Sequence, residues 1–537
     1  MAALTEIQQE IIQKYLKIVA KKKAHPTRSE MLRVGISRDK IYRHFGAFSN
    51  LRDQAKKADP QMFDGVIDQE LFTPRALKKL EGEVAKGNRF ILTTIVAGQK
   101  PHKAGIKSLK TMAKAQKAKL LFLLSVDPAH NLDKNPEAQP DPFFADELLV
   151  FSDIELNSNF FISNIKVGAK QIDPLHGLKR VGQRTGSFIV ASPKQRLDVV
   201  ATANNKLPRI LLSPGACTVP DYSTARFMSE RTAYVAEEDH QLGALIVEIK
   251  DNKRYFFRHV QIEPSGNVVD LGRYYQGDRT SHLPPEIFSI GDWHSGETDP
   301  LAKKAWFGCS KFTGCKTWIL HDLFNGKSIN HHEKDNLVTL AKRALSGNLL
   351  LENEFKQCAK DLVEIIEKGI TPVISRSNHD DFIDKWLMSG DFIQDPYNSR
   401  IGCDLFKAKL DGLNTLKHGI ENFGAFPKKY WDKVRWLERN EDFKIAGIEY
   451  GAHGDKGANG SKASIQGLEN GYGRGTFGHA HTPCIVRGIY VNGTSSYLKV
   501  DYNKEEGPSS WLNSSTLGYA NGSRQMIFEI DGEFMLP

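Results

Sequence analysis

The chain has 537 residues, which at roughly 150 residues per domain predicts about three or four domains. Hydrophobic residues make up 40% and charged residues 26%, a balance that excludes a disordered or collagen-like chain. The longest apolar run, residues 120–126, is far shorter than the roughly 20 residues of a membrane-spanning helix. The first ten residues contain Glu6 and Glu10 and no apolar core. We therefore expect no membrane span, no secretory signal and a cytoplasmic location.

The cysteines are few, widely scattered and without a CxxC pair. They are Cys217, Cys309, Cys315, Cys358, Cys403 and Cys484. Such spacing fits reduced thiols better than a disulfide framework, and it argues against a zinc finger.

Positive charge is concentrated at the start of the chain. The net charge is +9, but residues 1–120 hold 25 Lys and Arg against 11 Asp and Glu, a net of +14. The remainder is therefore about −5. This asymmetry indicates an N-terminal part that meets a polyanion such as DNA, with a basic solvated surface as the alternative.

Residues 1–60 have the pattern of a helix-turn-helix segment. Apolar residues are spaced as in a helix over 4–20, a short helix begins near residue 26, and Gly35 precedes a second helix capped by Ser37. Ile41 and Phe45 would pack inward. The basic residues left on the exposed side are Arg38, Lys40, Arg43 and His44. DNA contact is one interpretation, and a three-helix bundle that docks on the next domain is the other.

An α/β domain is expected over 61–220. Apolar runs at 90–96 and 120–126 indicate buried strands, as does 209–213, and the helix between the first two makes a strand–helix–strand unit. One face of that helix is basic, with Lys103, Lys107, Lys110, Lys114 and Lys117 at helical spacing. The opposite stripe is apolar and consists of Ile106, Leu109, Met112 and Ala113. The lysine face can follow DNA phosphates or can simply be solvated.

Residues 221–282 show alternating strand patterns separated by turn residues, as in an antiparallel β connector.

Residues that bind metal ions recur through the last half of the chain. In chain order they are Asp292, His294, Asp322, Asn378, His379, Asp380, His453, His479 and His481. Four of the five groups directly follow a predicted strand, at 286–290, 317–320, 371–375 and 443–450, and the fifth ends a glycine-rich loop. A single such group is weak evidence, but loops at strand ends can converge on one point.

The residue types favour a dinuclear centre. Two divalent ions about 3.5–4 Å apart require oxygen and imidazole ligands and a bridging carboxylate. Ligands of this kind without thiolates favour Mn²⁺, with Fe or Zn as alternatives. A bridged water with a pKa near roughly 7 could then attack phosphorus as hydroxide.

The motif series resembles that of the calcineurin-like metallophosphoesterases, including the SbcD group of double-strand-break repair nucleases, over residues 283–537. The resemblance implies a four-layer α/β sandwich of two mixed sheets flanked by helices. It places one metal on Asp292, His294, Asp322 and His481, and a second on Asp322, Asn378, His453 and His479. It also implies that His379 stabilises the transition state or protonates the leaving oxygen.

Three positions depart from the family pattern. His321 and Ser377 stand where glycine is usual, and Asn325 stands where a second Asp often follows the bridging residue. An amide cannot balance an imidazolium as a carboxylate does, which bears on His379. Asp380 is the candidate that could take over this catalytic role.

A glycine string at 471–475 suggests a mobile loop beside the metals. Within or near it, Arg474 or Lys462 could contact a phosphate, and a solvated loop is the alternative.

Together these features predict a dinuclear-metal-dependent DNase, endo- or exonucleolytic, that degrades host DNA. The order of basic helical segment, α/β middle and phosphodiesterase end is also similar to that of pre-early proteins of T-five-like phages, which act in host-DNA degradation and DNA transfer. That resemblance implies a location in the host cytoplasm, and we expect a homo-oligomer. Two alternatives stay open: a non-nucleolytic DNA-binding scaffold with a structural metal site, and a phosphatase or small-nucleotide phosphodiesterase.

Overall fold

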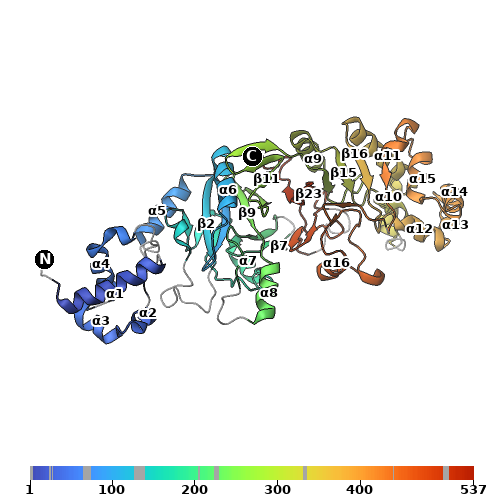
Figure 1. Ribbon diagram of the computed structural model, residues 1–537. Helices are drawn as coiled ribbons and strands as arrows, with labels where there is room; N and C mark the ends of the chain where they lie inside the picture. The colour runs from blue at the N-terminus through green and yellow to red at the C-terminus, as the bar shows by residue number, and fades with distance from the viewer. Residues whose placement is uncertain are drawn as a thin grey trace.

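The structure is a computed structural model that describes residues 4–22, 26, 28–46, 48–63, 74–125, 140–203, 206–222, 229–330, 336–439, 441–499 and 507–537. It is a mixed α/β protein with several sheets. Figure 1 shows the N-terminal helices (blue) at one end of an elongated molecule and the helices of residues 337–423 (yellow to orange) at the other. Over the described residues, no helix combines the length and the apolar character needed to cross a lipid bilayer.

The N-terminal segment is a small helical bundle with its own core. Its elements are α1 (Glu6–Lys22), α2 (Arg28–Arg33), α3 (Arg38–Phe45), α4 (Phe48–Ala58) and the 3₁₀ helix η1 (Pro60–Phe63). As predicted, Gly35 turns the chain at a φ of 79°, and the Ser37 side chain caps α3 by accepting a hydrogen bond from the Lys40 amide. Ile41 and Phe45 are buried, as predicted.

A five-stranded sheet with the order β10-β9-β1-β2-β3 follows this bundle. Its elements and neighbours are α5 (Pro74–Ala85), β1 (Arg89–Val96), α6 (Lys103–Ala115), β2 (Lys119–Ser125), η4 (Pro142–Phe144), β3 (Leu149–Val150), α8 (Glu230–Glu238), β9 (Gly243–Ile249) and β10 (Tyr255–Gln261). β1 and β2 pair in parallel around α6, which confirms the strand–helix–strand unit; Val126, the last residue of the predicted strand, lies outside the described residues. The predicted apolar stripe of α6 is buried.

A ten-stranded sheet joins the middle of the chain to its end. Its strands are β4 (Ile154–Asn157), β5 (Phe160–Ser163), β6 (Ser187–Val190), β7 (Gln195–Val200), β8 (Arg209–Pro214), β18 (Lys444–Ile445), β19 (Ile448–Glu449), β20 (Gly475–Phe477), β21 (Cys484–Val486) and β22 (Ile489–Val491). The helices beside it are α7 (Lys179–Thr185), η7 (Ala458–Gly460) and α16 (Ile465–Tyr472). The link is the antiparallel pairing of β7 with β21, in which Leu197 lies opposite Ile485. The sheet therefore crosses the expected boundaries at 220 and 283.

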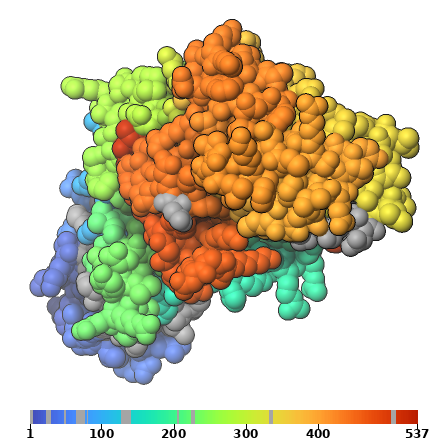
Figure 2. Space-filling model, turned by 90° about the vertical axis from the view of Figure 1, so that its right-hand side faces the viewer, coloured from blue at the N-terminus to red at the C-terminus, as the bar shows by residue number. Residues whose placement is uncertain are grey.

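A six-stranded mixed sheet carries the first candidate ligands. Its strands are β14 (Ile287–Ile290), β15 (Thr317–Leu320), β16 (Thr371–Ile374), β17 (Arg435–Trp436), β23 (Ser514–Gly518) and β24 (Arg524–Phe528). The helices of this region are α9 (Pro300–Thr313), η5 (Lys327–Ile329), α10 (Leu337–Ser346), α11 (Leu351–Glu367), α12 (Asp381–Met388), α13 (Asp391–Gln394), α14 (Ser399–Leu410), α15 (Thr415–Phe423) and η6 (Lys428–Lys433). Figure 2 looks onto this end of the molecule, where the orange surface of α14 and α15 lies toward the viewer.

Alternate residues of the six-stranded sheet face two different layers. Ile287 and Ile319 pack with Ile448 of the ten-stranded sheet, whereas Phe288 and Trp318 pack in the core shared with the helices. This period of two follows from the pleat of a strand. The six-stranded sheet thus lies between the helices and the ten-stranded sheet, and loops from both sheets meet at one edge.

Three local predictions differ from the structure. Residues 443–450 form a hairpin of β18 and β19 rather than one strand, because Ala446 and Gly447 turn the chain at positive φ angles of 51° and 72°. The connector 221–282 includes α8 in addition to its strands; the strands β11 (Val268–Asp270), β12 (Arg273–Gln276) and β13 (Arg279–His282) form an antiparallel sheet there. The first helix, expected over residues 4–20, spans Glu6–Lys22.

Candidate metal centre

The candidate ligands come from the loops that follow five strands. Those after β14, β15 and β16 carry Asp292 and His294, Asp322, and Asn378. These three strands are parallel, so their carboxyl ends lie at one edge of the sheet. The loops after β19 and β20, which pair in parallel in the other sheet, carry the remaining histidines, His453, His479 and His481.

The first group of side chains is buried and compact. Asp292, His294, Asp322 and His481 offer ligand atoms that all lie within 4.8 Å of one another. Nε2 of His481 lies 2.9 Å from Oδ2 of Asp292 and 3.2 Å from Nε2 of His294. Nε2 of His294 lies 3.8 Å from Oδ2 of Asp322. This group could hold a metal ion.

A second group adjoins the first at Asp322. Oδ1 of Asn378 lies 3.0 Å from Nε2 of His453 and 3.1 Å from Nδ1 of His479. Nε2 of His453 lies 3.4 Å from Oδ2 of Asp322. The same carboxylate oxygen of Asp322 therefore lies near one histidine of each group, and all seven predicted ligands occupy one site.

The backbone of the site is conformationally unusual. His294, Asp322, His479 and His481 have positive φ angles of 49°, 47°, 73° and 54°. L-residues in this region carry a cost of order 1–3 kcal/mol each, and such residues cluster at functional sites. Four left-handed residues aim their side chains at a common point.

The electrostatics of the site fit a cation. Burial alone would raise the pKa of Asp322, but positive charge on the nearby imidazoles, above all that of His453, holds it well below its usual value. Burial lowers the pKa of His294 to about 3, so its imidazole is neutral. Burial opposes protonation of His453 as well, yet the Asp322 carboxylate raises the pKa of His453 to about 9.

Two carboxylate oxygens of the site lack protein partners. Oδ1 of Asp292 and Oδ1 of Asp322 are buried without a hydrogen bond among the described residues. Uncompensated buried charge is unfavourable unless the group is paired or coordinates a metal. Carboxylate, amide and imidazole donors together suit Mn²⁺, Fe or Zn, so the residues present fit such ions.

His379 has a main-chain partner in place of a carboxylate. Its Nδ1 lies 2.6 Å from the carbonyl oxygen of Asn325. The Asn325 side chain donates to Oε2 of Glu297 at 3.0 Å, and Glu297 also pairs with Lys327. Thus Glu297, three residues after His294, holds the segment whose carbonyl orients His379. Sequence reasoning missed Glu297, and no motif spacing marks it.

Asp380 does not take the place of the missing carboxylate. Its Oδ2 accepts a hydrogen bond from the Ser377 amide at 2.9 Å, which closes the turn that holds Asn378. Burial raises the pKa of Asp380 to about 7. We therefore correct its role from a partner of His379 to a residue that stabilises this turn.

His321 fits its buried position because a glycine faces it. Burial lowers its pKa to about 4, and its Nε2 lies 3.2 Å from Oγ of Ser289. A Cβ atom built on Gly478 would collide with Oδ1 of Asp292 and with the His321 side chain. Because Gly478 has no side chain, the side chains of Asp292 and His321 can both pack against its backbone.

An arginine outside the motifs ties two ligand loops together. Nη2 of Arg439 lies 2.7 Å from Oδ2 of Asp381, and its Nη1 lies 2.5 Å from Oδ1 of Asp455. Asp381 follows the segment of Asn378, and Asp455 lies two residues after His453. No sequence pattern identifies this pairing, because the partners are 58 and 16 residues away.

The glycine string does not form a loop beside the metal ligands. Gly473 ends α16 and Gly475 begins β20, at the opposite end of that strand from His479. Arg474 donates to the Gly522 carbonyl at 3.3 Å, and Lys462 is exposed on the loop before α16. Arg474 is also exposed, so the expected contact of Arg474 or Lys462 with a phosphate stays a prediction.

The basic residues predicted to bind DNA lie on two helices. Arg38, Lys40 and Arg43 are on α3, at the end of the molecule far from the candidate ligands (Figure 1). On α6, the exposed lysines are Lys103, Lys107, Lys110 and Lys114. Two of these are paired within the chain, Lys107 with Asp278 and Lys110 with Glu147, each at 2.5 Å. Lys117 lies beyond the end of α6 at a φ of 52°, so its expected place on the helix is wrong.

The chain is similar to a phage protein. It is 27% identical over 477 residues to Protein A1 of Escherichia phage T5, with 84% of each chain covered. This similarity extends well beyond the C-terminal half that carries the candidate ligands. No protein-family model and no solved structure matches the chain.

Proposed function

We propose that this protein is a DNase that uses two divalent metal ions, most readily Mn²⁺. The observation that carries the proposal is the position of Asp322, whose Oδ2 lies 3.8 Å from Nε2 of His294 and 3.4 Å from Nε2 of His453. A carboxylate between two sets of donors is the arrangement that a dinuclear centre requires. Asp292 and His481 would complete one set.

The layers and the order of the ligands support a metallophosphoesterase sandwich over residues 283–537. Two mixed sheets pack together, and helices cover the outer face of one of them. Ligands follow successive strands of the first sheet and then of the second. In this proposal the ten-stranded sheet extends the sandwich with strands from residues 154–214.

The chemistry divides between the ions and the side chains. Two bound divalent ions would neutralise charge on the phosphate and lower the pKa of water enough for it to attack phosphorus. His379 contributes a ring nitrogen that can act on the phosphate or on the leaving oxygen. Because its Nδ1 donates to the carbonyl of Asn325, its Nε2 remains for the substrate. In the doubly protonated imidazolium form, Nε2–H can donate a hydrogen bond to a phosphate oxygen or give its proton to the leaving oxygen.

The positive charge of the N-terminal part of the chain supports DNA as the substrate. Residues 1–120 have a net charge of +14, and the exposed basic side chains include Arg38 and Arg43 of α3 and Lys103 and Lys114 of α6. Such surfaces bind phosphates without reading sequence. The similarity to a T5 protein supports a phage origin, and host DNA is the substrate that we propose for such a protein.

The test compares substrates. Purified protein is incubated with circular duplex DNA, linear duplex DNA, bis(p-nitrophenyl) phosphate and p-nitrophenyl phosphate, in Mn²⁺ and in EDTA. We expect Mn²⁺-dependent cleavage of DNA; loss of the circle indicates an endonuclease, and loss of only the linear form indicates attack at ends. Hydrolysis restricted to the small esters would favour a phosphatase or small-nucleotide phosphodiesterase. DNA binding without cleavage would favour a scaffold.

A further inference from the structure

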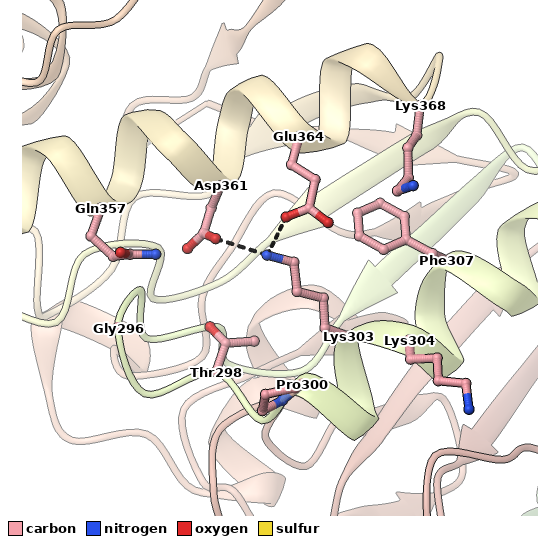
Figure 3. A pocket seen from close by; sticks show the side chains of 10 residues that line it. All are labelled: Gly296, Thr298, Pro300, Lys303, Lys304, Phe307, Gln357, Asp361, Glu364 and Lys368. Carbon is pink, nitrogen blue, oxygen red and sulfur yellow. Dashed lines mark hydrogen bonds and ion pairs between the residues drawn. The ribbon is translucent and has the colours of Figure 1, made fainter.

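A cleft begins beside the metal-ligand loop and runs away from it between two helices. It has a volume of about 590 Å³ and is lined by residues of the loop 296–300, α9 and α11. Figure 3 shows Gly296 and Gln357 at one end and Lys304, Phe307 and Lys368 at the other. Thr298, which lines the cleft, donates a hydrogen bond to the main-chain carbonyl oxygen of Trp293 at 2.7 Å, and its hydroxyl lies 3.4 Å from the main-chain carbonyl oxygen of His294, so the cleft starts on the loop that carries this candidate ligand.

Both acidic groups in the cleft pair with Lys303, so these three side chains carry a net charge of −1, against +2 on Lys304 and Lys368. Nζ of Lys303 lies 3.0 Å from Oδ1 of Asp361 and 2.5 Å from Oε2 of Glu364 (Figure 3). The other oxygen of Asp361 accepts a hydrogen bond from the indole of Trp293 at 3.0 Å. The carboxylates therefore serve to fix Lys303 and the loop of Trp293.

Two lysines at the far end keep their charge available. Lys304 and Lys368 are exposed, and neither makes an ion pair with another described residue. Nζ of Lys368 lies 5.1 Å from the centre of the Phe307 ring, which provides apolar surface between the lysines. An anion that enters the cleft thus meets two ammonium groups beside an aromatic side chain.

The length of the cleft fits a polymer better than a single phosphate. From Gln357 to Lys368, the eleven-residue rise along α11 is about 16 Å at 1.5 Å per residue. One strand of stacked DNA advances about 3.4 Å along its axis per phosphate, so this length accommodates more than one phosphate of a strand.

We infer that the cleft between α9 and α11 holds a single strand of DNA that leads away from the cleaved phosphate, with its backbone charge met by Lys304 and Lys368. This inference rests on the proposed function for the choice of ligand. It assigns to the C-terminal half a DNA contact that is independent of α3 and α6.

The test measures binding without cleavage. Full-length protein in EDTA is titrated against a fluorescein-labelled 12-nucleotide single strand, and fluorescence anisotropy is recorded at several salt concentrations. The double variant Lys304→Gln/Lys368→Gln is compared with Lys311→Gln, an exposed lysine of the same helix α9 that does not line the cleft. We expect about tenfold weaker binding by the double variant and a salt slope smaller by about 1, with no change in Lys311→Gln.

A second measurement locates the strand directly. The same oligonucleotide with 5-iododeoxyuridine is photocrosslinked to the wild-type protein, and crosslinked peptides are identified by mass spectrometry. Crosslinks to peptides of α9 or α11 are expected. Equal affinity of wild type and double variant, or crosslinks confined to α3 and α6, would overturn the inference. Because both measurements are made in EDTA, failure of Mn²⁺-dependent cleavage would count against the proposed nuclease and not against the cleft.

Discussion

Nδ1 of His379 lies 2.6 Å from the main-chain carbonyl oxygen of Asn325. A neutral carbonyl thus occupies the position where the resemblance noted in the sequence implies a carboxylate. It fixes the ring orientation and places the proton on Nδ1, although it stabilises a protonated ring less than a charged partner would. The position of that carbonyl depends in turn on Glu297, which binds the side chain of Asn325.

Removal of the Glu297 carboxylate should slow catalysis without loss of metal. Glu297→Ala removes the contacts of Glu297 with Asn325 and Lys327. We expect a rate of DNA cleavage about tenfold lower, because residues that hydrogen-bond to site residues without touching the substrate have effects of this size. Glu297→Gln retains an acceptor for Asn325 and should lie between this variant and wild type. Cleavage rates and bound Mn²⁺ are measured together. The control is Glu352→Gln, an exposed ion-pair residue of α11; a rate for Glu297→Ala equal to that of the control would contradict the prediction.

Loss of Arg439 should weaken metal binding by the group around Asn378 and His453. Arg439→Gln separates the loops of Asp381 and Asp455, and outer residues of this kind affect metal affinity by about 10–100-fold. Calorimetric titration with Mn²⁺ should show one weakened site and one site unchanged. Arg435→Gln, which removes an exposed pair with Glu441, is the matched control. Two unchanged sites in Arg439→Gln would count against the assigned positioning role.

A methyl group at Gly478 should disrupt the site. The added Cβ in Gly478→Ala would displace Asp292 or His321, with a cost of about 1–3 kcal/mol from overpacking and weaker Mn²⁺ binding. Gly471→Ala serves as the control, because a Cβ there meets no atom within 4 Å. Thermal unfolding and metal titration of both variants provide the check. Wild-type affinity in Gly478→Ala would show that the close approach to Asp292 is unimportant.

His259 should make the fold less stable in mild acid. Burial lowers its pKa to about 4, and its Nε2 lies 3.0 Å from the Ser213 carbonyl oxygen. In the unfolded chain its pKa is about 6.5, so between these values the unfolded state binds more protons and stability falls as the pH decreases. The full effect is about 3 kcal/mol. Thermal unfolding of wild type and His259→Gln is compared at pH 7.5 and pH 4.5; the variant should lose less stability on acidification, and an equal loss would refute the assignment.

Local elements could be predicted from the sequence because their signals are local. Apolar runs at 90–96 and 120–126 marked β1 and β2, and Gly35 with Ser37 marked the turn into α3. Strand partners could not be predicted. A strand pattern such as 195–200 indicates burial but carries no information that β7 pairs with β21 almost 290 residues later.

The candidate ligands could be found because each follows a strand with a motif of fixed spacing. The residues that support them could not. Glu297 and Arg439 act through contacts that exist only in the folded chain, and their partners lie at no regular separation. The expected partnership of Asp380 with His379 is wrong for the same reason: adjacency to His379 in sequence does not determine where a side chain points.

The most direct test of the dinuclear nuclease is to measure bound Mn²⁺ and DNA cleavage in the same samples of wild type and His379→Ala. We expect two Mn²⁺ ions per chain in both proteins and cleavage that is at least about 100-fold slower in the variant, as follows from the loss of a general acid. Wild-type protein that binds two ions but leaves DNA intact, or a His379→Ala variant that cuts at the wild-type rate, would contradict this expectation.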